Sequence, residues 1–282
     1  MRIFKLIRYD IKNGFWQSKW RLLSLIILVA FSCMDFYIRK NNVYFFEAVI
    51  PQGTFGDYMC YLFGGIPEYH PKTDEEFIFP IKWFLFHLVL LYGTLHYSIR
   101  DLYSVGNIIL PRSTQRSAWW FSKCLWNALY VITAYAVVFV TILGFCMITG
   151  EQIALPVTGE FMNLLMEANS SFSKFPIQFS VMMLFLPCLL SIGNSLILLV
   201  LTLFLKPVLS YGIMIIFLLC GAYFNSMFWW ESLTMSLQSE WVVQGGYTMF
   251  HAAILGGVVI IGAWIVGGIY FQKYDILNLD SE

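Results

Sequence analysis

The sequence predicts an all-α polytopic membrane protein, with an N-terminal amphipathic surface helix, six transmembrane helices, both termini inside the cell, and a short non-spanning outer helical segment before the last span. Of the 282 residues, 59% are hydrophobic and only 12% are charged, with a mean hydropathy of +0.70. A soluble domain of this length needs far more charge to cover its surface. Two further observations support the prediction: six long apolar runs, and an uneven distribution of lysine and arginine.

The first element is a basic amphipathic helix over residues 1–20. Its stretch RIFKLIRYDIKNGFWQSK repeats apolar residues at intervals of four: Ile3, Ile7, Ile11 and Phe15. The cations occupy the other side of the helix: Arg2, Lys5, Arg8 and Lys12. A helix with one cationic and one apolar face lies in the membrane surface rather than across it.

Six apolar runs follow, each long enough to cross a bilayer, which takes roughly 20 helical residues. The expected spans are residues 22–38, 81–99, 121–146, 178–203, 208–224 and 249–271. Residues 225–248 are too polar to span, although they are rich in Trp and Met. We find no internal repeat and no soluble domain, so a single transmembrane domain is expected to fill residues 1–282.

The cations indicate the orientation, because cytoplasmic loops carry an excess of lysine and arginine. With both termini inside, twelve of the 17 lysines and arginines fall in inner segments. Five fall in outer segments: Arg39, Lys40, Lys72, Lys82 and Lys174. We therefore expect a multi-pass protein of the plasma membrane with both termini in the cytoplasm.

Catalytic motifs are absent from the sequence. It contains no P-loop, no H-E-x-x-H and no G-x-S-x-G, and its cysteines and histidines form no metal-binding cluster. We therefore expect no enzyme, no metal and no cofactor in this chain. The formal net charge of zero gives no reason to expect a nucleic-acid partner.

Polar residues inside spans are costly and often functional. Tyr92, His96 and Arg100 follow one another at intervals of four, on one face of the second expected span. They could line a translocation pathway, or Arg100 could reach the headgroups while His96 bonds a neighbouring helix. Asn194 in the fourth span could likewise line a pathway or bond across helices.

The segment between the second and third spans carries a more specific pattern. In DLYSVGNIILPRSTQRSAWWFSKCLW, we note Asp101–Leu102, Gly106, Arg112, Arg116, Trp119–Trp120 and Lys123. This order, and the topology of nearly the whole chain, resemble the permease subunit of type 2 ABC exporters. The local string is similar to a branch from Gram-positive bacteria that exports amphipathic peptides, such as phenol-soluble modulins, and bacteriocin-like peptides.

The resemblance implies a function and a set of partners. Residues 1–20 would be the elbow helix, residues 100–120 a cytoplasmic coupling loop, and residues 225–248 an extracellular re-entrant segment. A separate cytoplasmic ABC ATPase would bind ATP and Mg. Two copies of the chain, or this chain and a related permease, would enclose a pathway for a peptide substrate within the membrane lipid.

The resemblance also implies roles for individual residues of the coupling segment. The expected contacts with the ATPase are Asn107, Ile109, Arg112, Ser113, Gln115 and Arg116. The expected membrane anchors of the third span are Trp119, Trp120 and Lys123. Pro111 breaks any helix that runs through it, so a coupling helix ends before it or begins after it. Composition alone favours the simpler interpretation, an ordinary basic cytoplasmic loop beside a Trp belt.

Two other functions remain open from the sequence. A non-pumping membrane subunit for peptide immunity or sensing could share the whole topology. A secondary transporter usually has repeated halves and broken helices around ion ligands.

Overall fold

The computed structural model describes residues 2–45, 51–66, 77–106, 116–168, 172–224 and 229–273. Every regular element in these ranges is helical. The long helices are α1 (Arg2–Val43), α3 (Ile81–Asp101), α5 (Arg116–Thr149), α7 (Ile177–Leu201), α8 (Pro207–Tyr223) and α9 (Met249–Lys273). The short ones are α2 (Phe55–Phe63), α6 (Gly159–Met166), the π-helical turn η1 (Leu102–Gly106), and the 3-10 turns η2 (Trp230–Thr234) and η3 (Ser236–Gln238).

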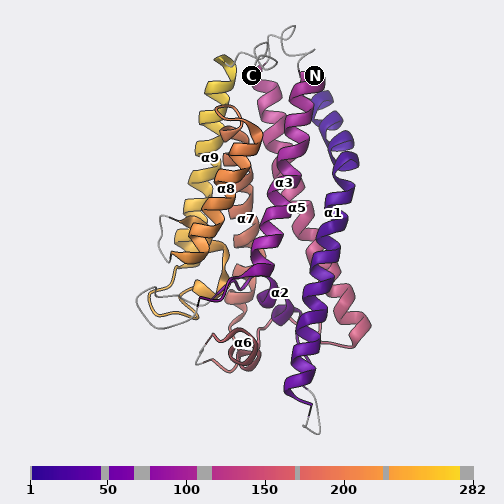
Figure 1. The fold of residues 1–282 in the computed structure, drawn as a ribbon, viewed down its shortest axis with the longest axis vertical. Coiled ribbons are helices and arrows are strands. Elements are labelled where there is room, and N and C mark those ends of the chain that lie inside the picture. The colour runs from indigo at the N-terminus through magenta and orange to yellow at the C-terminus, as the bar shows by residue number, and fades with distance from the viewer. Residues whose placement is uncertain are drawn as a thin grey trace.

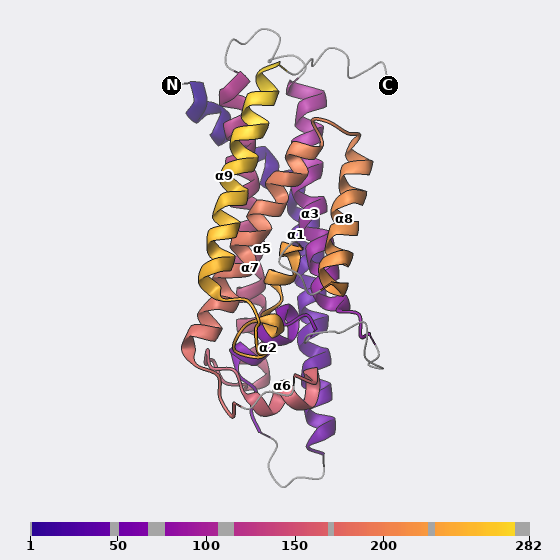
Figure 2. The ribbon, with the colours of Figure 1, turned by 90° about the vertical axis from the view of Figure 1, so that its left-hand side faces the viewer.

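The six long helices form one elongated bundle (Figure 1). Helix α1 packs along α5, α7 packs along α9, and α3 lies between these pairs. The start of α1, the end of α3, the start of α5 and the end of α9 lie at one end, which we name the basal end (Figures 1 and 2). Helices α2 and α6 lie toward the opposite, distal end. The chain therefore begins and ends its helical bundle on the same side.

Four helices are long and apolar enough to cross a membrane: α1, α5, α7 and α9. Four of the six predicted spans therefore coincide with helices that have the length and composition to cross a membrane. Helix α8 is apolar but has only 17 residues, and α3 has 21 residues with more polar side chains. Along α9, large apolar side chains such as Phe250 and Val258 are 72% and 64% exposed. An apolar surface of this kind is typical of contact with membrane lipid or with another protein.

Helix α1 differs from the prediction. We expected a surface helix over residues 1–20 and a separate span from residue 22, whereas the structure has one unbroken helix from Arg2 to Val43. No proline interrupts the sequence between the two segments, so the backbone hydrogen bonds continue. At 1.5 Å per residue, α1 is about 63 Å long, roughly twice the thickness of a hydrocarbon core.

Gly14 explains how α1 lies so close to α5. A Cβ atom at this position would fall 2.0 Å from the indole nitrogen of Trp126 on α5. Only glycine leaves room for the buried Trp126 ring at this crossing.

The segment between α8 and α9 does not span. Its turns η2 and η3 are almost completely buried, and η2 packs against α7 and α8. The Leu237 amide donates to the carbonyl of Gly64, just beyond α2. A non-spanning helical segment before the last long helix agrees with the prediction for residues 225–248, of which residues 225–228 lie outside the described residues.

Candidate functional site

The expected coupling loop, residues 100–120, lies at the basal end of the bundle. The structure describes its two ends, which form turn η1 and the first residues of α5. Five of its expected ATPase contacts, together with Pro111, lie outside the described residues: Asn107, Ile109, Arg112, Ser113 and Gln115.

Arg116 is the one predicted contact residue that the structure describes. It opens α5, and its guanidinium donates to the carbonyl of Gln272 at the end of α9, at 3.1 Å. This contact ties the start of α5 to the end of α9. Arg116 therefore forms a hydrogen bond to another helix of the same chain, a contact that no pattern in the sequence predicts.

A buried charge cluster, which we name the basal lock, joins α1, α3 and α5. Its centre is the Lys123 ammonium of α5, which is completely buried. It lies 2.5 Å from a carboxylate oxygen of Asp10 on α1 and 2.6 Å from one of Asp101 on α3. Tyr97 and Ser122 donate hydrogen bonds to Asp10, at 2.8 Å and 2.5 Å. The basal lock consists of Asp10, Tyr97, Asp101, Ser122 and Lys123.

The basal lock joins α1, α3 and α5 where the α3–α5 connection begins. One ammonium faces two buried carboxylates, so each acid depends on the shared lysine for its compensating charge. A buried ion pair contributes little net stability, but removing one partner is strongly unfavourable. The three helices are thus held in one relative position at this level.

The predicted membrane anchors are corrected by the structure. Lys123 lies inside the basal lock, and the side chains of Trp119 and Trp120 are also buried. Both indole rings stack on Phe271 of α9, at centroid distances of 4.8 Å and 5.8 Å. The prediction that Trp119, Trp120 and Lys123 contact lipid headgroups is wrong, because these side chains form a junction between helices.

Exposed aromatic side chains occur instead on α1. Trp16 and Trp20 are 70% and 69% exposed, and the Lys19 ammonium lies 3.9 Å and 5.6 Å from their ring centroids. This combination of indole and cation is typical of a membrane–water interface. The sequence signal is the pattern WQSKWR at residues 16–21, most of which falls within the predicted surface helix 1–20.

The four predicted pathway residues do not form one site. Tyr92, His96 and Arg100 share one face of α3, as their spacing indicates, and the Tyr92 and His96 rings are 5.9 Å apart. This face is turned outward, since Tyr92 is 47% exposed and Arg100 is exposed. Asn194 is buried inside the bundle on α7.

Asn194 belongs to a second buried polar site. Its amide donates to a carboxylate oxygen of Glu231 at 2.8 Å, and its carbonyl accepts from the Trp230 indole at 2.8 Å. Glu231 is completely buried, and its other oxygen has no hydrogen-bond partner among the described residues. Sequence reasoning missed Glu231, because it stands in the polar segment 225–248, which the sequence predicts as a non-spanning outer helical segment. A buried carboxyl of this kind is a natural candidate to hold a proton or to coordinate a cation.

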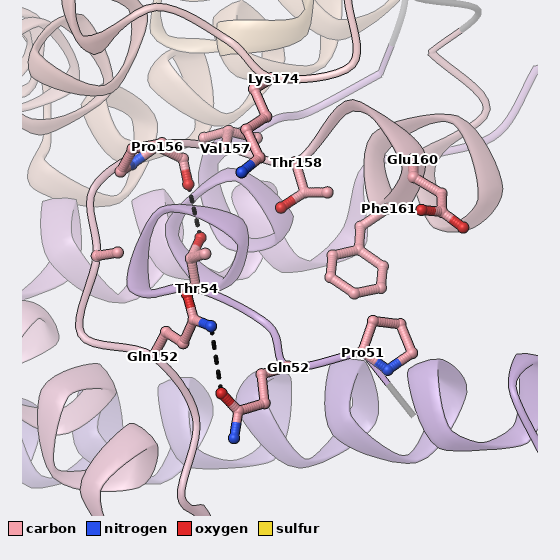
Figure 3. A pocket seen from close by; sticks show the side chains of 11 residues that line it. Pro51, Gln52, Thr54, Gln152, Pro156, Val157, Thr158, Glu160, Phe161 and Lys174 are labelled. Carbon is pink, nitrogen blue, oxygen red and sulfur yellow. Dashed lines mark hydrogen bonds between the residues drawn. The ribbon is translucent and has the colours of Figure 1, made fainter. Parts of the chain in front are cut away.

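The distal end contains a hollow of about 340 Å³ between the loops before α2 and α6 (Figure 3). Its sides are linked by hydrogen bonds from Thr54 to the Pro156 carbonyl and from Gln152 to Gln52. Lys174 and Glu160 stand at its edge and are exposed. Two hydrogen-bonded contacts therefore join the loops before α2 and α6 at this hollow.

Asp57 and Glu151 hold the distal loops together. Asp57 forms a capping box with Thr54 and accepts from the backbone and hydroxyl of Thr158. Burial raises the pKa of Asp57 to about 6, although these hydrogen bonds oppose the shift. Glu151 pairs with the buried Lys40 ammonium and accepts from the Gly53 amide. No group of three or more potential metal ligands occurs within the described ranges.

The helical bundle, its apolar exterior and its buried charges define the class: a multi-pass helical membrane protein. The sequence matches no known protein-family model, and no curated protein is similar to it.

Proposed function

We propose that this chain is the membrane-spanning permease subunit of an ATP-driven exporter. Six helices would cross the plasma membrane with both termini in the cytoplasm, including α3 and α8. The chain would pair with a second copy or a related permease and export amphipathic peptides. A separate cytoplasmic ABC ATPase would bind ATP and Mg, since the sequence carries no P-loop.

The observation that carries the proposal is the basal lock. A partner that pushes on the segment between η1 and α5 would act on Asp101, the last residue of α3, and on Lys123, the eighth residue of α5. Through Asp10, the same displacement would reach α1. A buried network of ion pairs and hydrogen bonds of this kind can carry a displacement from a contact surface to several helices.

The charge distribution supports the orientation. In the described part of the chain, the basal part of α1 carries Lys5, Arg8 and Lys12. Lys206 lies in the turn between α7 and α8, and Lys273 ends α9, both at the basal end of the bundle. The distal part carries fewer cations, in keeping with an outer side.

The test uses the permease co-purified with its ATPase in lipid nanodiscs. The variant Arg112→Glu should lower ATP hydrolysis by the complex without loss of membrane insertion. Arg116 is a poorer choice, because its bond to Gln272 would be lost too. The matched control is Lys174→Glu, which reverses an exposed cation at the distal end. Wild-type hydrolysis in Arg112→Glu would overturn the coupling assignment.

One observation favours a second candidate function. The buried carboxyl of Glu231, bonded to Asn194, is the kind of group that carries a proton in secondary transporters. In that case, Glu231→Gln would abolish transport driven by a proton gradient, and no ATPase would co-purify.

A further inference from the structure

A groove opens on the outer surface of the bundle between α1, α3 and α8. It has a volume of about 420 Å³. Aliphatic and aromatic side chains form most of its wall: Leu85, Leu88, Val89, Trp20, Tyr92 and Tyr211. The Tyr211 hydroxyl donates a hydrogen bond to the Leu88 carbonyl at 2.9 Å. Tyr211 therefore contributes its aromatic ring to the groove wall, and its hydroxyl is already bonded within the protein. The lining therefore suits an extended hydrocarbon chain.

Two arginines lie on the basal side of this groove. The half-buried Arg21 lines it and stands 5.3 Å from the Tyr92 ring centroid, with one hydrogen bond to the Gln17 carbonyl. Arg100 is exposed two turns further along the same face of α3. Within the described ranges, neither arginine forms an ion pair. The two charges are available to an anion.

His96 lies between Tyr92 and Arg100 on that face. Its Nδ1 atom is buried and has no hydrogen-bond partner in the described part of the chain. The basal side of the groove thus holds two cations, with between them an imidazole whose buried Nδ1 has no partner in the described part of the chain.

The depth of the arginines fits a lipid headgroup. Arg21 directly precedes the apolar run 22–38, and Arg100 directly follows the run 81–99. The exposed Trp16 and Trp20 stand at the same level of α1. Aromatic and cationic side chains at the ends of apolar runs mark the headgroup region.

We propose that this groove binds an anionic phospholipid, with its phosphate at Arg21 and Arg100 and one acyl chain along the wall formed by Leu85, Leu88 and Val89. A second copy of the chain fits less well. A two-fold interface would bring the same patch against itself and place the arginines of both copies together. The proposal is independent of the ATPase.

The experiment uses quenching of Trp20 by brominated lipid in nanodiscs of phosphatidylcholine. The Trp20 signal is the fluorescence of the wild type minus that of Trp20→Phe. Brominated phosphatidylglycerol should half-quench it at a mole fraction at least about five-fold lower than brominated phosphatidylcholine, since each arginine near the surface contributes about that factor. Trp264, which is 44% exposed on α9, is the matched control. Its signal is the fluorescence of the wild type minus that of Trp264→Phe, and the two brominated lipids should quench this signal equally.

Variants connect the preference to the arginines. Arg21→Gln with Arg100→Gln should remove the headgroup preference, and Arg21→Lys with Arg100→Lys should keep most of it. Equal quenching by both lipids in the wild type would overturn the proposal. So would a Trp20 signal that neither lipid quenches, since a second copy or a peptide would then cover the groove.

Discussion

Replacing Lys123 by methionine tests the basal lock directly. Methionine keeps the approximate volume of the side chain but removes the ammonium that faces two buried carboxylates. Asp10 would keep the hydrogen bonds from Tyr97 and Ser122. Asp101 would keep no side-chain donor among the described residues.

The size of the effect follows from the burial of these groups. The side chains of Lys123, Asp10 and Asp101 are 0%, 1% and 5% exposed. Removing one partner of such a pair costs about 3–5 kcal/mol. For a chain of this size, this lowers the melting temperature by roughly 6 °C or more.

The melting temperature can be measured in detergent with a thiol-reactive fluorophore. Cys33, Cys60, Cys124 and Cys146 are buried and free, so unfolding exposes them to the dye. The control Lys12→Met removes an exposed cation of α1 and should change the melting temperature by less than about 2 °C.

A triple variant separates charge from packing. Lys123→Met combined with Asp10→Asn and Asp101→Asn neutralises the whole basal lock and should recover much of the lost stability, because neutral replacements of a buried ion pair are well tolerated. A single Lys123→Met variant that melts with the wild type would refute the reasoning.

Three further predictions concern packing, pH and the inner polar site. A Cβ at Gly267 would fall 2.0 Å from a buried indole ring, whereas none lies near Gly262, so Gly267→Ala should melt several degrees lower and Gly262→Ala should not. The folded protein binds more protons at Asp57 than the unfolded chain between pH 3.8 and about 6. Wild-type stability relative to Asp57→Asn should therefore fall as the pH rises through this window, and equal pH profiles in thermal melts would contradict this. Asn194→Ala removes the hydrogen bond to Glu231 and should lower the free energy of unfolding, measured with denaturant, by about 1–3 kcal/mol. An unchanged free energy of unfolding would show that this hydrogen bond does not form.

The positions of several long helices could be predicted well from the sequence. The runs at 121–146 and 249–271 lie within the candidate spans α5 and α9, and the run at 81–99 lies within the more polar α3. The match follows because a helix in contact with lipid must be apolar over its whole length, and composition records this directly.

The environment of individual side chains could not be predicted in the same way. An indole ring fits both a headgroup region and a helix junction, so composition did not distinguish the buried Trp119 from the exposed Trp16. The basal lock joins Asp10 and Lys123, which stand 113 positions apart. The available signal was that Asp10 is the single acid in a basic helix, which is unusual for a surface position.

The inner polar site was missed for a related reason. Glu231 stands in the polar segment 225–248, which the sequence predicts to lie outside the bundle of spans and not within it. Its burial depends on the way η2 packs against α7 and α8. Tertiary packing of this kind leaves no local pattern.

The most direct test of the proposed function is site-specific photo-crosslinking from residue 113 in cells that express the chain. Ser113 would be replaced by a photoreactive phenylalanine analogue, with the exposed distal position Ile153 as the control. The proposal predicts a cross-link from position 113 to a separate chain that contains a P-loop ATPase, and no such product from position 153. The absence of an ATPase cross-link at position 113, with the protein folded and inserted, would contradict the assignment of this chain as an exporter subunit.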